Sequence, residues 1–387
     1  MMSRLRHFIP VLFLLSGACQ TGVPYHTPAE INQPNTETRQ QTTTISSRTT
    51  DNSPEITGTI SQTIDTNPQP TDIPTAQIIT TLLFTGNIVP ARCVQASIDN
   101  TGNPDYPYEK ISEITSQADL SISTLNATMS DRVEHTGCNW SYQMVGGSSN
   151  ADAMARAGFD VVSVATNHIK DCGLMKGWCN FALEDTLINL RRVGIFPVGA
   201  GKDLKEALQP VVATVNGVRF GFVSLGDSKM DDSVFATQDN PGIARLTSEN
   251  LENAIDAARK VSDVVIALPH WGPENEAVPN GIQRNQARLF VEAGADLVVG
   301  NHAHVVQAIQ EINGVPVFYG LGNFIFDQWY LQTRQGVILL IKFKGTKYLE
   351  YELIPTHVDQ DGQVFLAGSE EAAEILARII ETSQQLK

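Results

Sequence analysis

The feature that most constrains the fold is a repeated alternation of short apolar runs and amphipathic segments along residues 78–300. Short apolar runs are typical of buried strands, and apolar residues spaced three to four positions apart are typical of helices. The expected strands are residues 78–86, 119–125, 159–165, 218–225, 263–269 and 296–300. The expected helices are residues 150–158, 183–194, 249–261 and 281–294. Strands joined by helical crossovers predict an α/β fold with a largely buried sheet.

The pattern changes after residue 336. Residues 337–345 and 347–355 alternate in a way that predicts two antiparallel strands, and residues 370–386 predict a closing helix. Apolar residues make up 42% of the chain and charged residues 18%, which is sufficient for a substantial core. We therefore expect residues 78–387 to form one domain.

The first 19 residues have the pattern of a secretory signal. Arg4 and Arg6 precede the apolar run Phe8–Leu15, and small residues lead to Cys19. Residues 15–19 resemble a bacterial lipobox, in which the cysteine is lipidated and becomes the new N-terminus, although serine stands where leucine is usual. The prediction is an exported protein, lipid-anchored through Cys19 to the outside of a bacterial membrane. Plain secretion and a retained anchor are the alternatives, and the apolar run is far shorter than the ~20 residues of a membrane span.

Residues 20–77 are rich in Thr, Ser, Asn, Gln and Pro and contain few large apolar residues. Such a composition cannot bury a core, so a disordered tether is expected. The formal net charge of −15 argues against a nucleic-acid partner and against an anionic membrane surface. Membrane contact is therefore expected through the lipid anchor only.

Four cysteines follow Cys19. They are Cys93, Cys138, Cys172 and Cys179. An even number in an exported chain permits disulfides, and four cysteines allow three pairings. A local loop from Cys172 to Cys179 is plausible and would leave Cys93 for Cys138. Zinc binding is less favoured because no C-x-x-C pair is present.

Polar side chains recur directly after the expected strands, where ligands bind in open α/β sheets. These residues are Asn87 with Arg92, Asn126, Asn167 with His168, His270 with Glu274, and His302 with His304. A lone histidine or asparagine there is usually an ordinary loop residue, but four of the eight histidines share this position. Neutral imidazole binds divalent transition metals, and an amide oxygen can complete the shell. The recurrence favours a metal or catalytic centre, in which an extended segment would point His302 and His304 the same way.

Five motifs come in the order found in the CapA family. They are FTGNIVPAR (84–92), ADLSISTLN (118–126), GFDVVSVATNHIKDCG (158–173), IALPHWGPE (266–274) and GADLVVGNHAHVVQAIQEINGVPVFYGLGNFIFDQ (294–328). The chain thus resembles these bacterial capsule-synthesis proteins, which are linked to poly-γ-glutamate and similar in fold to calcineurin-like metallophosphoesterases. The resemblance covers about residues 78–345 and implies a four-layer α/β sandwich with a divalent-metal site at the strand ends.

The resemblance also implies residue roles. The expected metal-site residues are Asn87, Asn126, Asn167, His168, His270, His302 and His304. His302, His304 and Asn167 are the candidate catalytic groups. Glu274 matches the acidic residue of the family's HWG-x-E motif, and Arg92 matches a basic residue that could hold an anionic group.

Two positions depart from the family pattern. The family usually has aspartate at the position of Asn87 and glutamate at the position of Asn126. An amide offers a neutral oxygen, whereas a carboxylate brings charge and can bridge two cations. Two adjacent dications without bridging anions would repel each other, so we expect at most one divalent ion (Mn, Fe or Zn), or none.

The expected function is that of a cell-surface lipoprotein in the synthesis, export or anchoring of an envelope polymer such as poly-γ-glutamate, with a degraded metal site. The expected partners are an anionic envelope polymer, or a phosphorylated or peptidic substrate, and a membrane capsule-synthesis complex. An active metal-dependent hydrolase of phosphoesters or amides is the main alternative. A solute-binding lipoprotein is a weaker one, since the histidine cluster does not fit it.

Overall fold

The computed structural model describes residues 63–65, 78–227 and 229–386. They belong to one compact unit, Thr59–Lys387. The expected signal peptide (1–19), the lipidated Cys19 and the expected tether (20–77), apart from Thr63–Asp65, lie outside the described residues. Thr63–Asp65 forms strand β1, which pairs with another strand, so these three residues differ from the expected tether.

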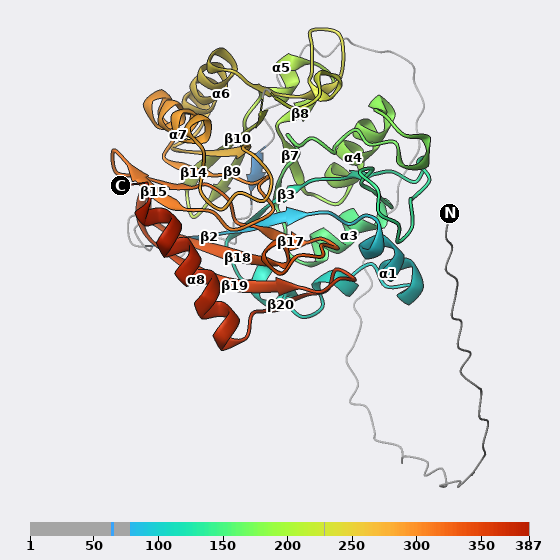
Figure 1. The fold of residues 1–387 in the computed structure, drawn as a ribbon. Coiled ribbons are helices and arrows are strands. Elements are labelled where there is room, and N and C mark those ends of the chain that lie inside the picture. The colour runs from blue at the N-terminus through green and yellow to red at the C-terminus, as the bar shows by residue number, and fades with distance from the viewer. Residues whose placement is uncertain (1–62, 66–77, 228, 387) are drawn as a thin grey trace, which may run out of the picture. The chain divides into compact units, whose positions relative to one another are not determined.

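Two eight-stranded sheets form the centre of the unit (Figure 1). Sheet I has the order β20-β19-β18-β2-β3-β6-β7, with β17 paired to β2. Its strands are β2 (Ile79–Ile88), β3 (Leu120–Leu125), β6 (Val161–Ser163), β7 (Phe196–Val198), β17 (Asn323–Ile325), β18 (Gln335–Lys344), β19 (Lys347–Val358) and β20 (Val364–Leu366). Strands β2, β3, β6 and β7 run parallel, so their carboxyl ends meet at one edge.

Sheet II has the order β1-β9-β10-β13-β14-β16-β15, with β12 paired to β10. Its strands are β1 (Thr63–Asp65), β9 (Val211–Val215), β10 (Val218–Asp227), β12 (Arg245–Leu246), β13 (Val264–His270), β14 (Leu297–Val299), β15 (Ile309–Ile312) and β16 (Val315–Phe318). Its central strands β10, β13, β14 and β16 are also parallel. Two short pairs lie outside the sheets: β4 (Thr128–Met129) with β5 (Val145–Gly146), and β8 (Ala200–Gly201) with β11 (Gly242–Ile243).

Helices cover the outer face of each sheet. The α-helices are α1 (Cys93–Thr101), α2 (Ser112–Thr115), α3 (Ser149–Arg156), α4 (Asn180–Arg192), α5 (Leu204–Ala207), α6 (Ser248–Val261), α7 (Gly281–Ala293) and α8 (Ser369–Gln384). Short 3-10 turns are Tyr106–Tyr108, Gly173–Met175, Asp232–Val234 and Leu331–Arg334. Helices α1, α3 and α4 pack on sheet I, and α6 and α7 pack on sheet II.

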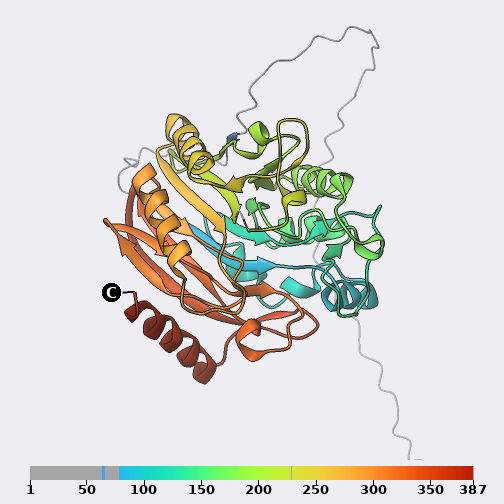
Figure 2. The same cartoon turned by 45° about the horizontal axis from the view of Figure 1, so that its top comes forward.

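The inner faces of the two sheets meet in an apolar core that includes Phe84, Ile122, Phe220 and Ile266. The order helix, sheet, sheet, helix confirms the expected four-layer α/β fold. Helix α8 packs against β19 and β15, beside the strands of both sheets (Figure 2). It buries Ile375 and Ile379 in the core between the sheets.

Four aspartates fix the starts of the parallel strands. Each one directly precedes a strand and accepts a hydrogen bond from a backbone N–H of the neighbouring strand. The pairs are Asp119 with Thr81 (2.7 Å), Asp160 with Ser121 (2.8 Å), Asp263 with Arg219 (2.9 Å) and Asp296 with Val265 (2.7 Å). Satisfying these donors holds neighbouring strands in register, and the register decides which residues reach the carboxyl ends.

All six expected strands and all four expected helices of residues 78–300 form, as do the β18–β19 pair and the closing helix. Both expected disulfides are present, Cys93–Cys138 and Cys172–Cys179. Among the residues that the structure describes, no helix is long and apolar enough to cross a membrane.

Candidate metal centre

The strand ends of both sheets bring seven of the expected site residues into one linked cluster. Asn87 is the penultimate residue of β2, Asn126 follows β3, and Asn167 and His168 follow β6 in sheet I. His270 ends β13, and His302 and His304 follow β14 in sheet II. The two sheets meet here, as the contact between Asn167 and His270 shows. The Oδ1 atom of Asn167 lies 3.2 Å from the Nε2 atom of His270.

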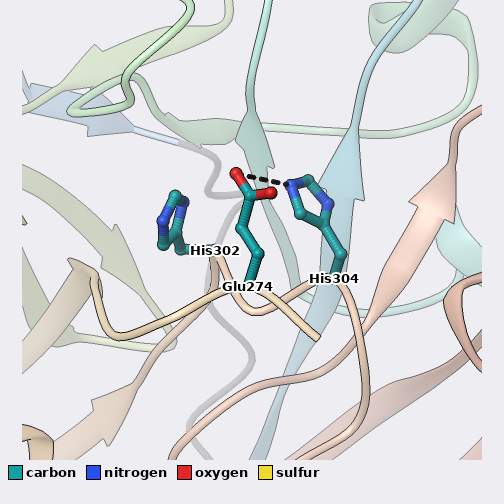
Figure 3. A group of neighbouring side chains, drawn as sticks. All are labelled: Glu274, His302 and His304. Carbon is teal, nitrogen blue, oxygen red and sulfur yellow. Dashed lines mark ion pairs between the residues drawn. The ribbon is translucent and has the colours of Figure 1, made fainter. Parts of the chain in front are cut away.

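Glu274, His302 and His304 form the group that can hold a metal ion. One ligand atom from each lies within 4.8 Å of the others. Figure 3 shows the Glu274 carboxylate between the two imidazole rings. Its Oε1 atom lies 4.0 Å from the Nε2 atom of His304, and the Glu274 side chain is 50% exposed while that of His304 is 8% exposed. The group thus has one carboxylate that solvent can reach and one imidazole held beneath it.

Three of the four site histidines, His270, His302 and His304, have lowered pKa values that favour the neutral imidazole. Burial lowers the pKa of His270 well below its ordinary value, and the neighbouring imidazoles lower it further. Burial and the nearby His304 lower the pKa of His302 to about 3. Burial also lowers the pKa of His304, although the Glu274 carboxylate opposes this shift. A neutral imidazole has a free lone pair, which is the form that binds metals.

A chain of hydrogen bonds connects Asn87 to His304 through Asn323 of β17. The Oδ1 atom of Asn323 accepts from the Nδ2 atom of Asn87 at 3.2 Å and lies 2.8 Å from the Nδ1 atom of His304. Asn87 also donates to the Gly322 carbonyl at 3.4 Å, whereas its own Oδ1 atom is buried and has no partner among the described residues. The amide therefore orients a histidine on one side and leaves an unused acceptor on the other.

His168 is oriented by two buried polar groups. Its Nδ1 atom lies 2.7 Å from the Oδ2 atom of Asp171, three residues later. Its backbone N–H donates to the Oδ1 atom of Asn126 at 3.4 Å. Burial raises the pKa of Asp171, while His168 and the Met144 N–H act against that shift. A histidine–carboxylate pair of this kind fixes the ring and its tautomer.

The backbone of His302–Ala303–His304 is not extended, so the alternation of side chains along a strand does not set how the two histidines point. His302 has φ 105° and His304 has φ 60°, values that side chains with a Cβ rarely adopt. The two ring centroids are nevertheless 6.1 Å apart. Strained residues of this kind persist where the surrounding structure holds them, and they concentrate at functional sites.

A close approach of two glycines makes room for this arrangement. A Cβ atom on Gly86 would lie 2.2 Å from the Gly322 carbonyl oxygen, which no side chain tolerates. Gly322 has φ 78° and would place its own Cβ 2.5 Å from the Gln335 carbonyl oxygen. Both positions therefore require glycine, and they bring β17 and Asn323 next to Asn87.

Arg92 lies beside the cluster, but its guanidinium is occupied by internal partners. It is 2% exposed, forms an ion pair with Asp327 and donates to the Ser141 carbonyl at 2.9 Å. It also lies over the rings of Phe326 (4.9 Å) and Trp140 (4.7 Å). Binding of an external anion by Arg92 stays a prediction, since it requires this pair to open.

The cluster opens to solvent through a cavity of about 380 Å³. Its lining includes Asn167, His168, Glu274 and His302, together with Asp227, Lys229 and Trp178. A ligand in this cavity could therefore reach the carboxylate and an imidazole of the metal-binding group.

The donor set fits one divalent transition-metal ion better than two. It combines neutral imidazoles with a single carboxylate, a mixture that suits Zn²⁺, Mn²⁺ or Fe²⁺. Three buried atoms have no hydrogen-bond partner in the described part of the chain, so lone pairs are available around the cluster: Asn87 Oδ1, Asn301 Oδ1 and His270 Nδ1. Among the residues that the structure describes, Glu274 is the one carboxylate of the metal-binding group.

Three residues that matter here were not singled out by sequence reasoning. They are Asp171, Asn323 and Asp327. Asp171 stands three residues after His168 in the motif of residues 158–173, and Asn323 and Asp327 lie in the motif of residues 294–328. Those motifs were the available signal.

Comparisons with known proteins agree with this arrangement of motifs. Residues 81–328 match the family described as bacterial capsule synthesis protein PGA_cap. The PGA biosynthesis protein CapA of Bacillus subtilis (strain 168) is 28% identical over 279 residues, covering 72% of this chain and 71% of that protein. The capsule biosynthesis protein CapA of Bacillus anthracis is 26% identical over 286 residues, covering 72% and 68%.

A solved structure described as a novel phosphatase of Mycoplasma pneumoniae aligns with 72% of this chain and 94% of that chain, with 13% identity and a TM-score of 0.46. The family match spans well over half of the chain and confirms the resemblance read from the motifs. The chain belongs to the bacterial capsule synthesis protein PGA_cap family.

Proposed function

We propose that this protein acts in the synthesis, export or anchoring of an envelope polymer such as poly-γ-glutamate, as a lipoprotein on the outside of a bacterial membrane. Family membership supports the capsule role, since two relatives are named for PGA or capsule biosynthesis. The charged, apolar and small-residue pattern that ends at Cys19 supports export and lipid anchoring.

The proposal includes a reduced metal centre in which Glu274, His302 and His304 hold a single divalent ion. The observation that carries it concerns Asn87, which stands where the family usually has a carboxylate. The Asn87 side-chain amide donates hydrogen bonds to Asn323 and Gly322. A bound ion would supply a Lewis acid that polarises a carbonyl or phosphoryl oxygen. Because the histidines stay neutral, Glu274 is the anion available to balance its charge.

Gene deletion with complementation tests the role in polymer assembly. The readout is the surface polymer of washed cells, measured as glutamate after acid hydrolysis. We expect deletion to abolish the polymer, the wild-type gene to restore it, and His302→Ala and His304→Ala to restore it poorly. His135→Ala is the matched control, because that histidine lies outside the cluster, and it should restore fully. Unchanged polymer after deletion would overturn the proposed role.

Cys19→Ala tests the lipid anchor separately. Loss of the anchor should move the protein from the membrane fraction to the medium, whatever happens to the polymer. Continued membrane retention of the Cys19→Ala protein would refute lipidation at this residue.

Hydrolysis is the second candidate function, and the buried His168–Asp171 pair favours it. A histidine oriented by a carboxylate can move a proton to a leaving group. Suitable probes are bis-p-nitrophenyl phosphate for phosphoesters and γ-glutamyl-p-nitroanilide for amides, each with added Mn²⁺. Metal-dependent turnover that disappears in His168→Asn would support this function. No turnover of either probe, even with Asn87→Asp and Asn126→Glu restored, would leave a binding or assembly role.

A further inference from the structure

A second cavity is lined by Trp140 and Asp327, two residues that contact Arg92. It has a volume of about 360 Å³. Its lining includes Cys93 and Cys138, the tryptophans Trp140 and Trp329, and Asp327. It shares no lining residue with the cavity over the metal-binding group.

Two exposed tryptophans distinguish this cavity. Trp140 is 58% exposed and Trp329 is 64% exposed, although tryptophan is a residue that proteins bury heavily. Both line the same cavity. Two indole rings that face water around one cavity are unfavourable unless a ligand covers them. The pair therefore indicates a binding site.

The segments that carry the two tryptophans are firmly held. Trp140 follows Cys138 by two residues, and Cys138 is bonded to Cys93 at the start of α1. Trp329 follows Asp327 by two residues, and Asp327 pairs with Arg92 and accepts the Cys93 N–H at 2.9 Å. A disulfide and a buried ion pair thus fix both rims before any ligand arrives, which lowers the entropy lost on binding.

The polar lining suits an uncharged ligand with many hydroxyl and amide groups. Ser97, Asn100, Asn139 and Gln360 offer hydroxyl and amide groups. Within the described part of the chain, the side chains of Asn100 and Gln360 form no hydrogen bond. The charged lining residues are Asp327 and Asp361, and neither lysine nor arginine lines the cavity among the described residues. Arg92 already balances the charge of Asp327, so Asp361 leaves the lining acidic, which disfavours an anionic polymer such as poly-glutamate.

We propose that this cavity binds a saccharide chain of neutral, N-acetylated hexose units. The apolar C–H face of a sugar ring packs on an indole ring, while its hydroxyl and acetamido groups bond to amides and carboxylates. One ring, next in sequence to the lining residue Asp327, contacts the metal centre. Phe326 lies 5.4 Å from the His304 ring, centroid to centroid, and 4.9 Å from the Arg92 guanidinium. A glycan held here would lie beside the centre, yet its binding is independent of the metal.

Calorimetric titration of the purified full-length protein with chitohexaose tests the proposal, in the presence of EDTA so that the metal centre takes no part. We expect saturable binding to the wild type, and Trp140→Ala and Trp329→Ala should each weaken it about tenfold or more. Trp140→Phe keeps an aromatic face and should recover much of the affinity. Circular dichroism melting of each variant establishes that it is folded.

Trp178→Ala is the matched control, because Trp178 is 38% exposed and lines the other cavity. It should bind chitohexaose like the wild type. The proposal is overturned if the wild type does not bind chitohexaose, or if Trp140→Ala and Trp329→Ala both bind it normally. It is also overturned if Trp178→Ala weakens binding as strongly as those two variants do. Binding of soluble poly-γ-glutamate that Trp140→Ala abolishes would also overturn it, since the occupant would then be an anionic polymer.

Discussion

The Nδ1 atom of His302 lies 3.1 Å from the Nε2 atom of His270, and the two ring centroids are 4.6 Å apart. Two imidazolium ions could not approach this closely in a buried site, so the pair holds a hydrogen bond between neutral rings. The lowered pKa values of both residues agree with this state. The protein therefore keeps a cluster of uncharged nitrogen bases beside one carboxylate, which is the electrostatic basis of the proposed metal centre.

Glu274→Gln should weaken metal binding at least about tenfold while leaving the fold unchanged. The side chain is half exposed, so the substitution removes charge from the centre without creating a buried void. Titration of Mn²⁺ followed by calorimetry measures the effect. Glu276→Gln is the control, since Glu276 is an exposed carboxylate two residues away. Equal affinities for Glu274→Gln and wild type would remove Glu274 from the centre.

Asn87→Asp should destabilise the metal-free protein by about 1–3 kcal/mol, because the new carboxylate would face the carbonyl oxygens of Gly322 and Asn323. Added Mn²⁺ should reverse this loss, since a cation turns the repulsion into coordination. Thermal melting with EDTA and with Mn²⁺ gives both values. Asn253→Asp, at an exposed position of α6, should show neither effect. A variant as stable as wild type in EDTA would mean that the Asn87 contacts do not constrain the site.

Asp160 should make the protein less stable as the pH rises toward neutrality. Burial raises the pKa of Asp160 to about 6. The Asp160 carboxyl therefore stays protonated to a higher pH in the folded protein than in the unfolded chain, and this difference stabilises the fold. The contribution of Asp160 to the free energy of unfolding is complete below about pH 3.9, the pKa of aspartate in the unfolded chain. It is lost as the pH rises through about 6, the pKa in the folded protein. Asp160→Asn should therefore gain stability over wild type at pH 7, by up to about 3 kcal/mol, and match it near pH 4.

Denaturant unfolding between pH 4 and pH 7 measures this difference. Asp119→Asn is the matched control, because Asp119 accepts the same kind of strand N–H but is exposed. A pH-independent difference between Asp160→Asn and wild type would show that Asp160 does not titrate as described.

Arg92→Met should destabilise the protein by about 3–5 kcal/mol, because it leaves the Asp327 carboxylate buried without its partner. Burial already raises the pKa of Asp327, and Arg92 opposes that shift. The double variant Arg92→Met with Asp327→Asn should recover a large part of the loss. Chemical unfolding of the three proteins and wild type gives the coupling energy. Additive effects of the two changes would show that the ion pair does not act as a unit.

Much of the layered fold could be predicted from the alternation of apolar runs, because the parallel strands are buried on both faces and read as continuous apolar segments. The hairpins β9–β10 and β15–β16 were missed. Their turns, Asn216-Gly217 and Asn313-Gly314, have positive φ at both residues and were a usable signal. Strand β17 was not predictable in this way, since it pairs with β2 across more than two hundred residues of sequence.

The residues of the centre were found because they follow strands whose carboxyl ends meet. Their detailed roles depend on contacts that no local pattern contains. Asn323 arrives through β17, and the left-handed backbone of His302 and His304 results from the packing around them. The internal pairing of Arg92 with Asp327 was hidden for the same reason, since the two residues are 235 positions apart.

The most direct test of the account is the amount of metal bound by the protein. The purified protein is exposed in turn to Mn²⁺, Fe²⁺ and Zn²⁺, excess ion is removed, and bound metal is counted by mass spectrometry, with His302→Ala as the control. We predict one equivalent of a divalent ion in wild type and almost none in the control. Two equivalents would contradict the account, because the site would then hold a metal pair without its usual carboxylates. Absence of bound metal would contradict it equally.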